Sequence, residues 1–446
     1  MTNTTNSRIA LAVLGTSALM LGACSSDEDT KAAETATDAV DQEDHDHEGH
    51  DHDGDDHEGH DHEDGVGEGA SLPEVSAPEP RVAISYDGGV LVLDGGDLQE
   101  GENPEVLDEF DADGFLRLNP AGDGRHVFVS TEDKFKVLDI GSYRRAHGDH
   151  FHHYAGDPSF TDFEVDAKEP GHVVGGKRYA TLFDDKSGQV TDVRLTGMAV
   201  TDQFEVPAHH GIAVRGEDDT YMVTLSDDEG DRIGVAQYDA EGKELKRFEE
   251  CEGAHGAAEA GKTVLVGCVD GALLYKDGEV TKVKSPDEYG RIASEFTNED
   301  GRFVLTDYDN DKEAADKDER ALPNKVAIVD VKDEKMNIID LGDVNYSFRS
   351  LAMAEDNTAV VLGTDGKLHL IDPEEGEITK SIDVLDKWEV PEDWQEGRPA
   401  VSVAGMTAYV TDPENKKLYV IDLTGKDDTL SVELPETPSE IIATQG

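Results

Sequence analysis

A short pattern recurs along most of this chain, in which two apolar residues are followed by an acidic residue that favours a turn. The acidic residues of the successive copies are Asp94, Asp139, Asp184, Asp239, Asp277, Asp330, Asp372 and Asp422. Their spacing ranges from 38 residues (Asp239 to Asp277) to 55 residues (Asp184 to Asp239), and strand-like runs such as "HVFVST", "TVLVGC" and "AVVLGT" lie between them. Several β-strands per repeat at this period are typical of the blades of a β-propeller.

Eight copies of the pattern predict an all-β propeller of eight blades over residues 81–446. Seven blades remain an alternative because the third and fourth copies are irregular. A two-sheet sandwich would have to be unusually long and explains the period poorly. The first strands are predicted in "RVAISYDGGVLVLDGG" (81–96), on either side of an Asp-Gly-Gly turn.

The N-terminus predicts export. An apolar run from Ile9 to Ala23 follows Arg8 and is too short to span a bilayer as a mature helix, which is typical of a signal peptide over residues 1–23. It ends in "LGAC", which matches a bacterial lipobox and predicts a lipid-modified Cys24. The alternative is an ordinary signal peptide with a chance cysteine. We therefore expect an extracytoplasmic protein, lipid-anchored to the outer face of the bacterial cell membrane.

Residues 24–80, which we call the tether, contain almost no large apolar residue and are predicted to be disordered. Within the tether, "HDHEGHDHDGDDHEGHDHE" (45–63) places histidines among acidic residues and glycines. These histidines are His45, His47, His50, His52, His57, His60 and His62. Because two of them can meet one ion in many registers, the segment predicts weak metal capture with easy exchange. An inert spacer is the alternative.

The charge balance excludes some partners. The chain carries 101 acidic residues against 39 Lys and Arg, a formal net charge of −62. Nucleic acid and anionic membrane surfaces are therefore disfavoured, whereas cations are attracted. An acidic, solvated surface suited to salty surroundings is the simpler interpretation.

The two remaining cysteines, Cys251 and Cys268, predict a disulfide, since an oxidising compartment favours their pairing. A thiolate metal site is the alternative, and the absence of a CxxC spacing weakens it.

Ten histidines lie in the predicted propeller. His126, His172 and His369 occur singly on or beside strands, and we interpret them as structural. The others cluster in "HGDHFHHY", "PAHHGIAV" and "EGAHGAA", and they are His147, His150, His152, His153, His209, His210 and His255. Turn histidines that bond the backbone are the alternative for these clusters.

The repeat places the clusters. His255 lies 22 residues before Asp277, just ahead of an innermost strand, and His210 has a comparable place in its own copy. "HGDHFHHY" leads toward the third copy. Because such segments lie on one face near the propeller axis, we expect His210 and His255 to share a metal with one or two of His147, His150, His152 and His153. Imidazole ligands without Met or Cys favour Zn²⁺, with Cu²⁺ or Ni²⁺ as alternatives.

These histidine motifs resemble the AztD-type zinc metallochaperones, and the resemblance covers about residues 81–446. It rests on "HGDHFHHY", "HHGIAV", "CEGAHG" and an N-terminal His/Asp tract. It implies a secreted β-propeller that binds Zn²⁺ and passes it to the solute-binding protein of a zinc ABC importer. The lipobox and the longer acidic tract depart from this family.

Two other classes of function are kept as alternatives. A lactonase-like propeller hydrolase would use a carboxylate-rich central metal and turn over an ester or lactone, and no nucleophile–base constellation is readable in the sequence. A surface adhesion or scaffold propeller would bind protein without metal. We therefore predict a protein that is not an enzyme.

Overall fold

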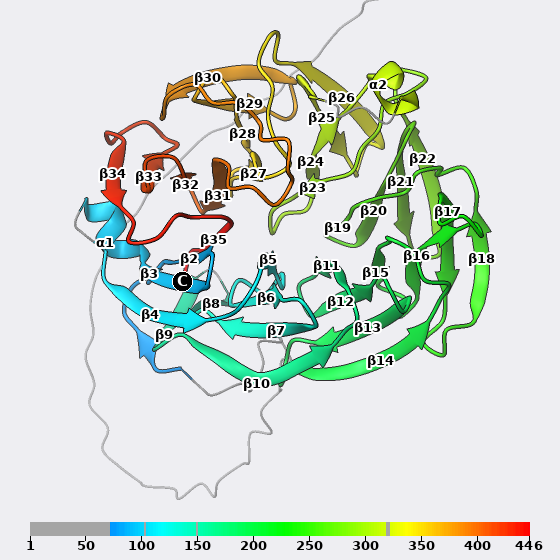
Figure 1. Ribbon diagram of the computed structural model, residues 1–446, viewed down its shortest axis with the longest axis horizontal. Helices are drawn as coiled ribbons and strands as arrows, with labels where there is room; N and C mark the ends of the chain where they lie inside the picture. Colours follow the sequence, from blue (N-terminus) through cyan, green and yellow to red (C-terminus); the bar gives the residue numbers. More distant parts are fainter. Residues whose placement is uncertain (1–71, 102–103, 149, 318–321) are drawn as a thin grey trace, which may run out of the picture. The chain divides into compact units, whose positions relative to one another are not determined.

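The fold is nearly all β, as the sequence predicts. The computed structural model describes residues 72–101, 104–148, 150–317 and 322–446. In this part of the chain, eight four-stranded antiparallel sheets are arranged around a ring (Figure 1). This arrangement confirms the β-propeller, and the eight sheets favour the prediction of eight blades over seven. The predicted signal peptide, Cys24 and all the tether histidines lie outside the described residues.

The four strands of each sheet run in order from the propeller axis outward. The first sheet consists of β35 (Ile441–Thr444), β2 (Arg81–Tyr86), β3 (Gly89–Asp94) and β4 (Val106–Asp111). The second consists of β5 (Arg117–Pro120), β6 (His126–Ser130), β7 (Lys134–Asp139) and β10 (Ser159–Asp166). The next two are β11 (Pro170–Gly175), β12 (Tyr179–Asp184), β13 (Gln189–Arg194), β14 (Ala199–Glu205) and β15 (Ala213–Arg215), β16 (Tyr221–Ser226), β17 (Arg232–Tyr238), β18 (Glu244–Phe248).

The fifth and sixth sheets are β19 (Ala257–Ala260), β20 (Thr263–Cys268), β21 (Gly271–Lys276), β22 (Glu279–Lys284) and β23 (Glu295–Phe296), β24 (Phe303–Tyr308), β25 (Lys325–Asp330), β26 (Lys335–Asp340). The last two are β27 (Leu351–Met353), β28 (Ala359–Leu362), β29 (Lys367–Asp372), β30 (Glu377–Asp383) and β31 (Ala400–Ala404), β32 (Thr407–Asp412), β33 (Lys417–Asp422), β34 (Leu430–Glu433).

A ninth, three-stranded sheet has the order β1 (Glu74–Val75), β9 (His150–Ala155) and β8 (Ser142–His147). The described helices are short, α1 (Gly95–Glu100) and α2 (Lys312–Asp316). Neither has the length and apolar character that a bilayer-crossing helix needs, and the described residues contain no other candidate.

The two ends of the propeller domain close the ring. β35, near the C-terminus, pairs antiparallel with β2, with Arg81 opposite Thr444 and Ile84 opposite Ile441. The first sheet is therefore built from both ends of the domain. Unfolding one end exposes the edge of the other, so we expect the ring to unfold cooperatively.

The repeated acidic residue has a structural role. Asp372 ends β29, and its carboxylate accepts hydrogen bonds from the backbone N–H groups of Glu374 and Glu375 at 2.8 and 3.1 Å. The carboxylate thereby stabilises the turn between the third and outermost strands. Asp184 is an exception, because it ends β12, the second strand of its sheet. The irregular spacing of the third copy arises from this shift.

Apolar side chains on both faces of the inner strands fill the space between neighbouring sheets. Between the second and third sheets, for example, Val137 packs in one buried cluster with Leu182 and Val193. Each sheet is thus covered on both sides by its neighbours, which fixes the innermost strands close to the axis.

Two expectations about the chain's path are wrong. The composition predicts a tether that ends at residue 80, but Glu74–Val75 forms β1 and pairs with β9. The repeat predicts that the "HGDHFHHY" segment leads into the third blade. Instead, the β8–β9 hairpin interrupts the second sheet, because the chain returns from it to form β10 against β7.

The innermost strands define two faces of the ring. The chain enters each innermost strand at one face, which we call the upper face, and turns into the second strand at the other, the lower face. Segments that precede β15 and β19 therefore lie at the upper face, and turns that follow β23 and β27 lie at the lower face.

Candidate metal centres

Three histidines from three consecutive sheets meet at the upper face. His172 lies in β11, whereas His210 and His255 precede the innermost strands β15 and β19. One ligand nitrogen of each lies within 4.8 Å of the other two, and we call this group the inner-strand triad. The register of β11 against β12 shifts between Pro170 and Val173, so an irregularity of the strand falls at His172. Such bulges re-aim a side chain.

The distances in the inner-strand triad suit a metal ion. The Nε2 atoms of His210 and His255 lie 3.1 Å apart, and the imidazole centroids of the triad are 4.7 to 5.2 Å apart. Two nitrogens at about 2.0–2.1 Å from a tetrahedral zinc would lie about 3.3 Å from each other. The Nε2 atoms of His210 and His255 therefore lie within a few tenths of an ångström of the separation expected for two zinc ligands, and the His172 ligand nitrogen lies within 4.8 Å of both.

The second nitrogen of each ring has a hydrogen-bond acceptor. Nδ1 of His172 lies 3.1 Å from the carbonyl oxygen of Gly211, and Nδ1 of His255 lies 3.0 Å from that of Ala293. Nδ1 of His210 lies 2.5 Å from a carboxylate oxygen of Asp185. Because these oxygens only accept, each Nδ1 is the donor in its contact, which leaves Nε2 as the ligand atom of a neutral ring. Zinc-ligating histidines are oriented in this way.

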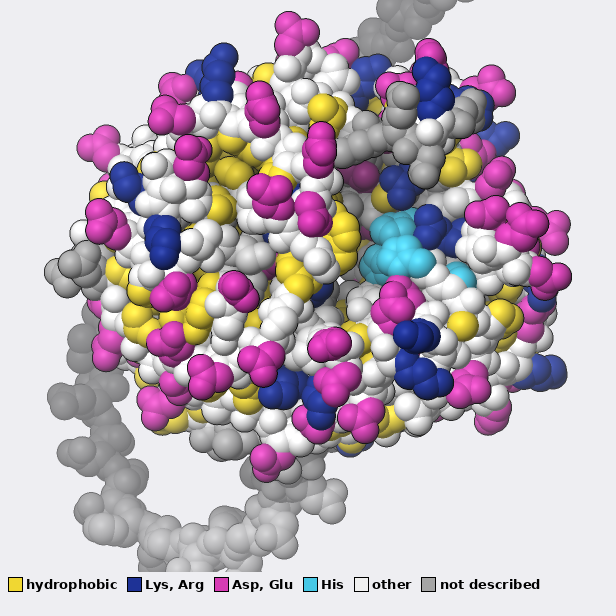
Figure 2. Space-filling view, in the orientation of Figure 1, with side chains coloured by type: hydrophobic (Ala, Val, Ile, Leu, Met, Phe, Trp, Pro, Cys, Tyr) yellow, Lys and Arg dark blue, Asp and Glu magenta, His cyan; other side chains and the backbone are white. Residues whose placement is uncertain are grey.

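Burial keeps two of the three rings neutral. Burial, with the neighbouring His210 and Arg117, lowers the pKa of His172 to about 3. Burial and the neighbouring His172 also hold the pKa of His255 well below its ordinary value. Neutral imidazole is the form that binds metal. His210 is 53% exposed and opens the triad to solvent, and Figure 2 shows histidine side chains beside a hollow at the centre of this face.

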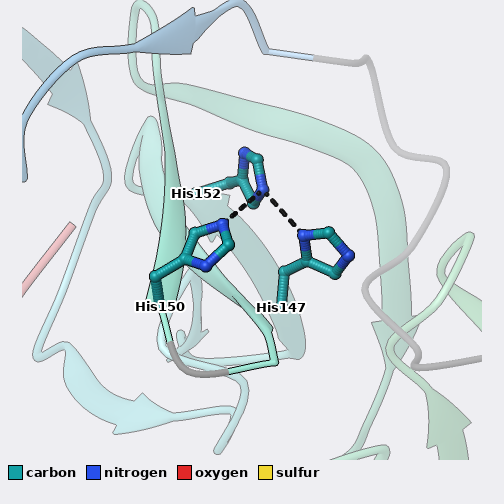
Figure 3. Close-up of side chains that lie close together, drawn as sticks. All are labelled: His147, His150 and His152. Atoms are coloured by element: carbon teal, nitrogen blue, oxygen red, sulfur yellow. Dashed lines mark hydrogen bonds between the residues drawn. The ribbon is translucent and has the colours of Figure 1, made fainter. Parts of the chain in front are cut away.

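A second group, the hairpin triad, consists of His147, His150 and His152 (Figure 3). His147 lies directly opposite His150 across the β8–β9 hairpin, and His152 lies on the same face of β9 as His150. Nε2 of His152 is 3.2 Å from Nδ1 of His147 and 3.3 Å from Nε2 of His150. These distances also fit ligands of one zinc ion.

The end of the tether contacts the hairpin triad. Glu74 in β1 places a carboxylate oxygen 2.7 Å from Nδ1 of His152, so the far nitrogen of this ring is also held by an acceptor. The hairpin lies at the lower face, where Arg144 forms ion pairs at 3.2 Å with Glu299 and Glu355 in the turns after β23 and β27. The two triads therefore lie at opposite faces of the ring.

Two predicted ligands belong to neither triad. His209 is buried, with Nδ1 2.7 Å from the carbonyl oxygen of Pro207 and Nε2 2.6 Å from Thr224 Oγ1, so both its nitrogens are engaged. Nδ1 of His153 lies 3.0 Å from the carbonyl oxygen of Gly446. Consecutive residues of a strand point to opposite faces, which separates His153 from His152.

The single mixed site predicted from the sequence is wrong. His210 and His255 do meet, but none of the histidines of "HGDHFHHY" joins them in the described groups. The third ring is His172, whose isolated position in the sequence suggests a structural role instead. A neighbouring glycine does not distinguish His172, because glycines also adjoin histidines outside this triad, as Gly148 adjoins His147. His126 and His369 do bond nearby side chains, in agreement with a structural role.

Near the inner-strand triad, the Sγ atoms of Cys251 and Cys268 lie at disulfide distance. Cys251 lies in the segment that leads to His255. Cys268 ends β20, and its carbonyl oxygen accepts a hydrogen bond from the backbone N–H of Ile292. Pairing of the two cysteines would join the segment that presents His255 to β20. The disulfide stays a prediction, which the intact mass of the non-reduced protein tests.

Sequence comparison identifies a relative with a known role. No protein-family model matches the chain. The zinc chaperone AztD of Citrobacter koseri is 27% identical over 358 residues, which cover 77% of this chain and 82% of the relative. This confirms the resemblance to AztD. The alignment is long enough to take in most of the propeller.

Solved structures agree with this likeness to AztD. The crystal structure of Citrobacter koseri AztD matches with a TM-score of 0.72 and 23% identity, covering 83% of this chain and 99% of that one. Its apo form matches with a TM-score of 0.70 over 83% and 98% of the two chains. Dihydro-heme d1 dehydrogenase NirN reaches a TM-score of 0.52 at 15% identity, over 84% and 77%. These structures support the fold alone.

Proposed function

We propose that this protein is an extracytoplasmic zinc chaperone, which captures Zn²⁺ and passes it to the solute-binding protein of a zinc ABC importer. The observation that carries the proposal is the inner-strand triad, in which His172, His210 and His255 converge while an acceptor holds each Nδ1. Likeness to the zinc chaperone AztD supports the same role.

Three imidazoles leave one position of a tetrahedral zinc open. Closed structural sites use four protein ligands, whereas an open position admits a ligand from outside. Direct transfer to another protein requires such a position, because an incoming ligand must bind before a resident one leaves. The exposure of His210 gives this position a route to solvent.

The remaining histidines would bind zinc separately, because the hairpin triad lies at the opposite face of the ring. We propose that the tether captures zinc weakly and that the hairpin triad receives it, since β1 joins the end of the tether to that triad through Glu74 and His152. A lipid anchor at Cys24 would hold the protein at the outer face of the cell membrane, near an importer. The acidic chain, with a net charge of −62, would raise the local concentration of cations.

Direct transfer is tested with the zinc-loaded full chain and the metal-free solute-binding protein of a zinc importer from the same organism. After mixing, the proteins are separated and their zinc is measured, with and without excess chelator that traps free zinc. We expect transfer to persist in the presence of the chelator. Transfer that disappears with the chelator, or that is no faster than spontaneous release, would contradict a chaperone role.

A further inference from the structure

The inner-strand triad lies among arginines, although the chain as a whole is strongly acidic. Arg232 donates from Nη1 to the backbone oxygen of His210 at 3.1 Å. Arg291 lies two residues before Ala293, whose carbonyl oxygen is 3.0 Å from Nδ1 of His255. Figure 2 shows Lys and Arg side chains next to the histidines on this face. Guanidinium groups near a cation site are unexpected, because like charges repel.

These arginines are incompletely neutralised by the protein. In the described part of the chain, the Arg291 side chain makes no hydrogen bond or ion pair, and the buried Nε of Arg232 has no acceptor. Arg117, which also acts on His172, differs because it pairs with Glu440 at 2.8 Å. Burial and the nearby Arg291 lower the pKa of Arg232, in agreement with repulsion between the two guanidiniums.

The nearest acidic side chains accept no hydrogen bond from the Arg291 guanidinium in the described part of the chain. Asp185 accepts from His210. Asp307 Oδ1 accepts from the backbone N–H groups of Ala293 and Ser294 at 2.7 and 2.8 Å, and Asp309 Oδ1 accepts from Asp311 N–H at 2.9 Å. Zinc on three neutral imidazoles would add two more positive charges beside Arg232 and Arg291.

We propose that the upper face binds a carboxylate together with zinc, one oxygen completing the zinc coordination and the other accepting hydrogen bonds from Arg291 and Arg232. The planar guanidinium matches a carboxylate in this way. Zinc and the carboxylate then bind cooperatively, each strengthening the other. The inference rests on the proposed function, since it supplies the ligand at the open position of the transported ion.

The alternative role for these arginines is simple repulsion that weakens zinc binding and hastens release. The two accounts make opposite predictions for Arg291→Gln. Loss of repulsion would tighten zinc binding equally with or without a carboxylate. Loss of a carboxylate site would instead remove the dependence of zinc binding on the carboxylate.

The experiment measures the tightest zinc of the full chain by competition with a chelator, while acetate replaces perchlorate at constant ionic strength. His147→Gln, His150→Gln and His152→Gln are introduced together to remove the hairpin triad. We expect acetate at ten times its dissociation constant to tighten zinc binding by about tenfold. Arg291→Gln should abolish this effect, and the control Arg302→Gln, whose ion pairs are with Asp330 and Glu374, should retain it.

A second arm distinguishes a free carboxylate from the acidic side chains of the tether. Acetate dependence in the full chain supports a free anion. Acetate dependence that appears only when residues 45–63 are deleted assigns the carboxylate to the tether. Tight zinc binding that ignores acetate in both chains, or that Arg291→Gln tightens at every acetate concentration, would overturn the inference. Absence of tight zinc would instead contradict the proposed function.

Discussion

The Nε2 atoms of His210 and His255 lie 3.1 Å apart, although 45 residues separate the two histidines in sequence. Both rings have an acceptor at Nδ1, so in their Nδ1–H forms the two Nε2 lone pairs face each other. A shared metal ion would use both lone pairs. Two neighbouring sheets of the propeller thus hold half of a zinc site in place.

His172→Gln should abolish the tight binding of zinc at the inner-strand triad. The substitution removes one of three ligands, and because loss of an orienting partner alone costs about 10–100-fold in metal affinity, we expect a loss larger than this. Chelator competition at pH 7 measures it. The matched control is His209→Gln, which alters a buried neighbour with no place in the triad. Equal affinities for His172→Gln and the unsubstituted chain would show that His172 is structural.

Asp185→Asn should weaken zinc binding without changing its stoichiometry. Asp185 accepts from Nδ1 of His210 and so fixes both the tautomer and the orientation of this ring. Removal of such a partner costs about 10–100-fold in affinity. Isothermal titration gives both quantities. An unchanged affinity would mean that His210 needs no support from the β12–β13 turn.

Much of the fold could be predicted from the sequence, because each sheet has the same requirements for packing and chain reversal. Apolar alternation and a turn acid recur wherever a strand must pack on both faces and then reverse, as at Asp372. In the third copy the prediction was wrong only about which turn the acidic residue stabilises. Asp184 lies at the turn after the second strand of its sheet, whereas its counterparts follow the third strand.

The site was only partly predictable for a different reason. His210 and His255 precede innermost strands, so the repeat placed both correctly. His172 lies inside β11 at an irregularity of pairing, and a single sequence contains no direct signal for such a bulge. The hairpin triad was misplaced because "HGDHFHHY" folds back on itself between β7 and β10. The local sequence indicated a histidine cluster, but not that the chain leaves the second sheet after β7 and returns to it as β10.

The hairpin triad should bind a second metal ion that the inner-strand triad does not need. His152→Gln removes the ring whose Nε2 faces both partners. The adjacent His153→Gln is the control, because that side chain bonds the C-terminal Gly446 instead. Zinc titration should lose one equivalent in the first variant and none in the second. Loss of one equivalent in both variants would point to damage to the hairpin rather than to a ligand.

Acidification should empty the tether before the inner-strand triad. An ordinary histidine has a pKa of about 6.5, and neighbouring carboxylates favour its charged form, so tether histidines protonate first as the pH falls. His172, whose pKa is lowered to about 3, stays neutral at pH 5. The same shift makes the metal-free fold less stable as the pH falls below about 6.5, where the unfolded state takes up the proton. Zinc retained after dialysis at successive pH values tests this order. Simultaneous release of all zinc near pH 6.5 would contradict it.

The most direct test compares zinc binding by three forms of the full chain: unsubstituted, His210→Ala with His255→Ala, and a deletion of residues 45–63. Zinc retained against a competing chelator is measured for each form. The account predicts that the double substitution abolishes the tightest phase and leaves the weak, multi-ion phase, whereas the deletion removes weak ions and leaves the tightest phase intact. A double variant that keeps the tightest phase unchanged would contradict the inner-strand triad as the zinc site.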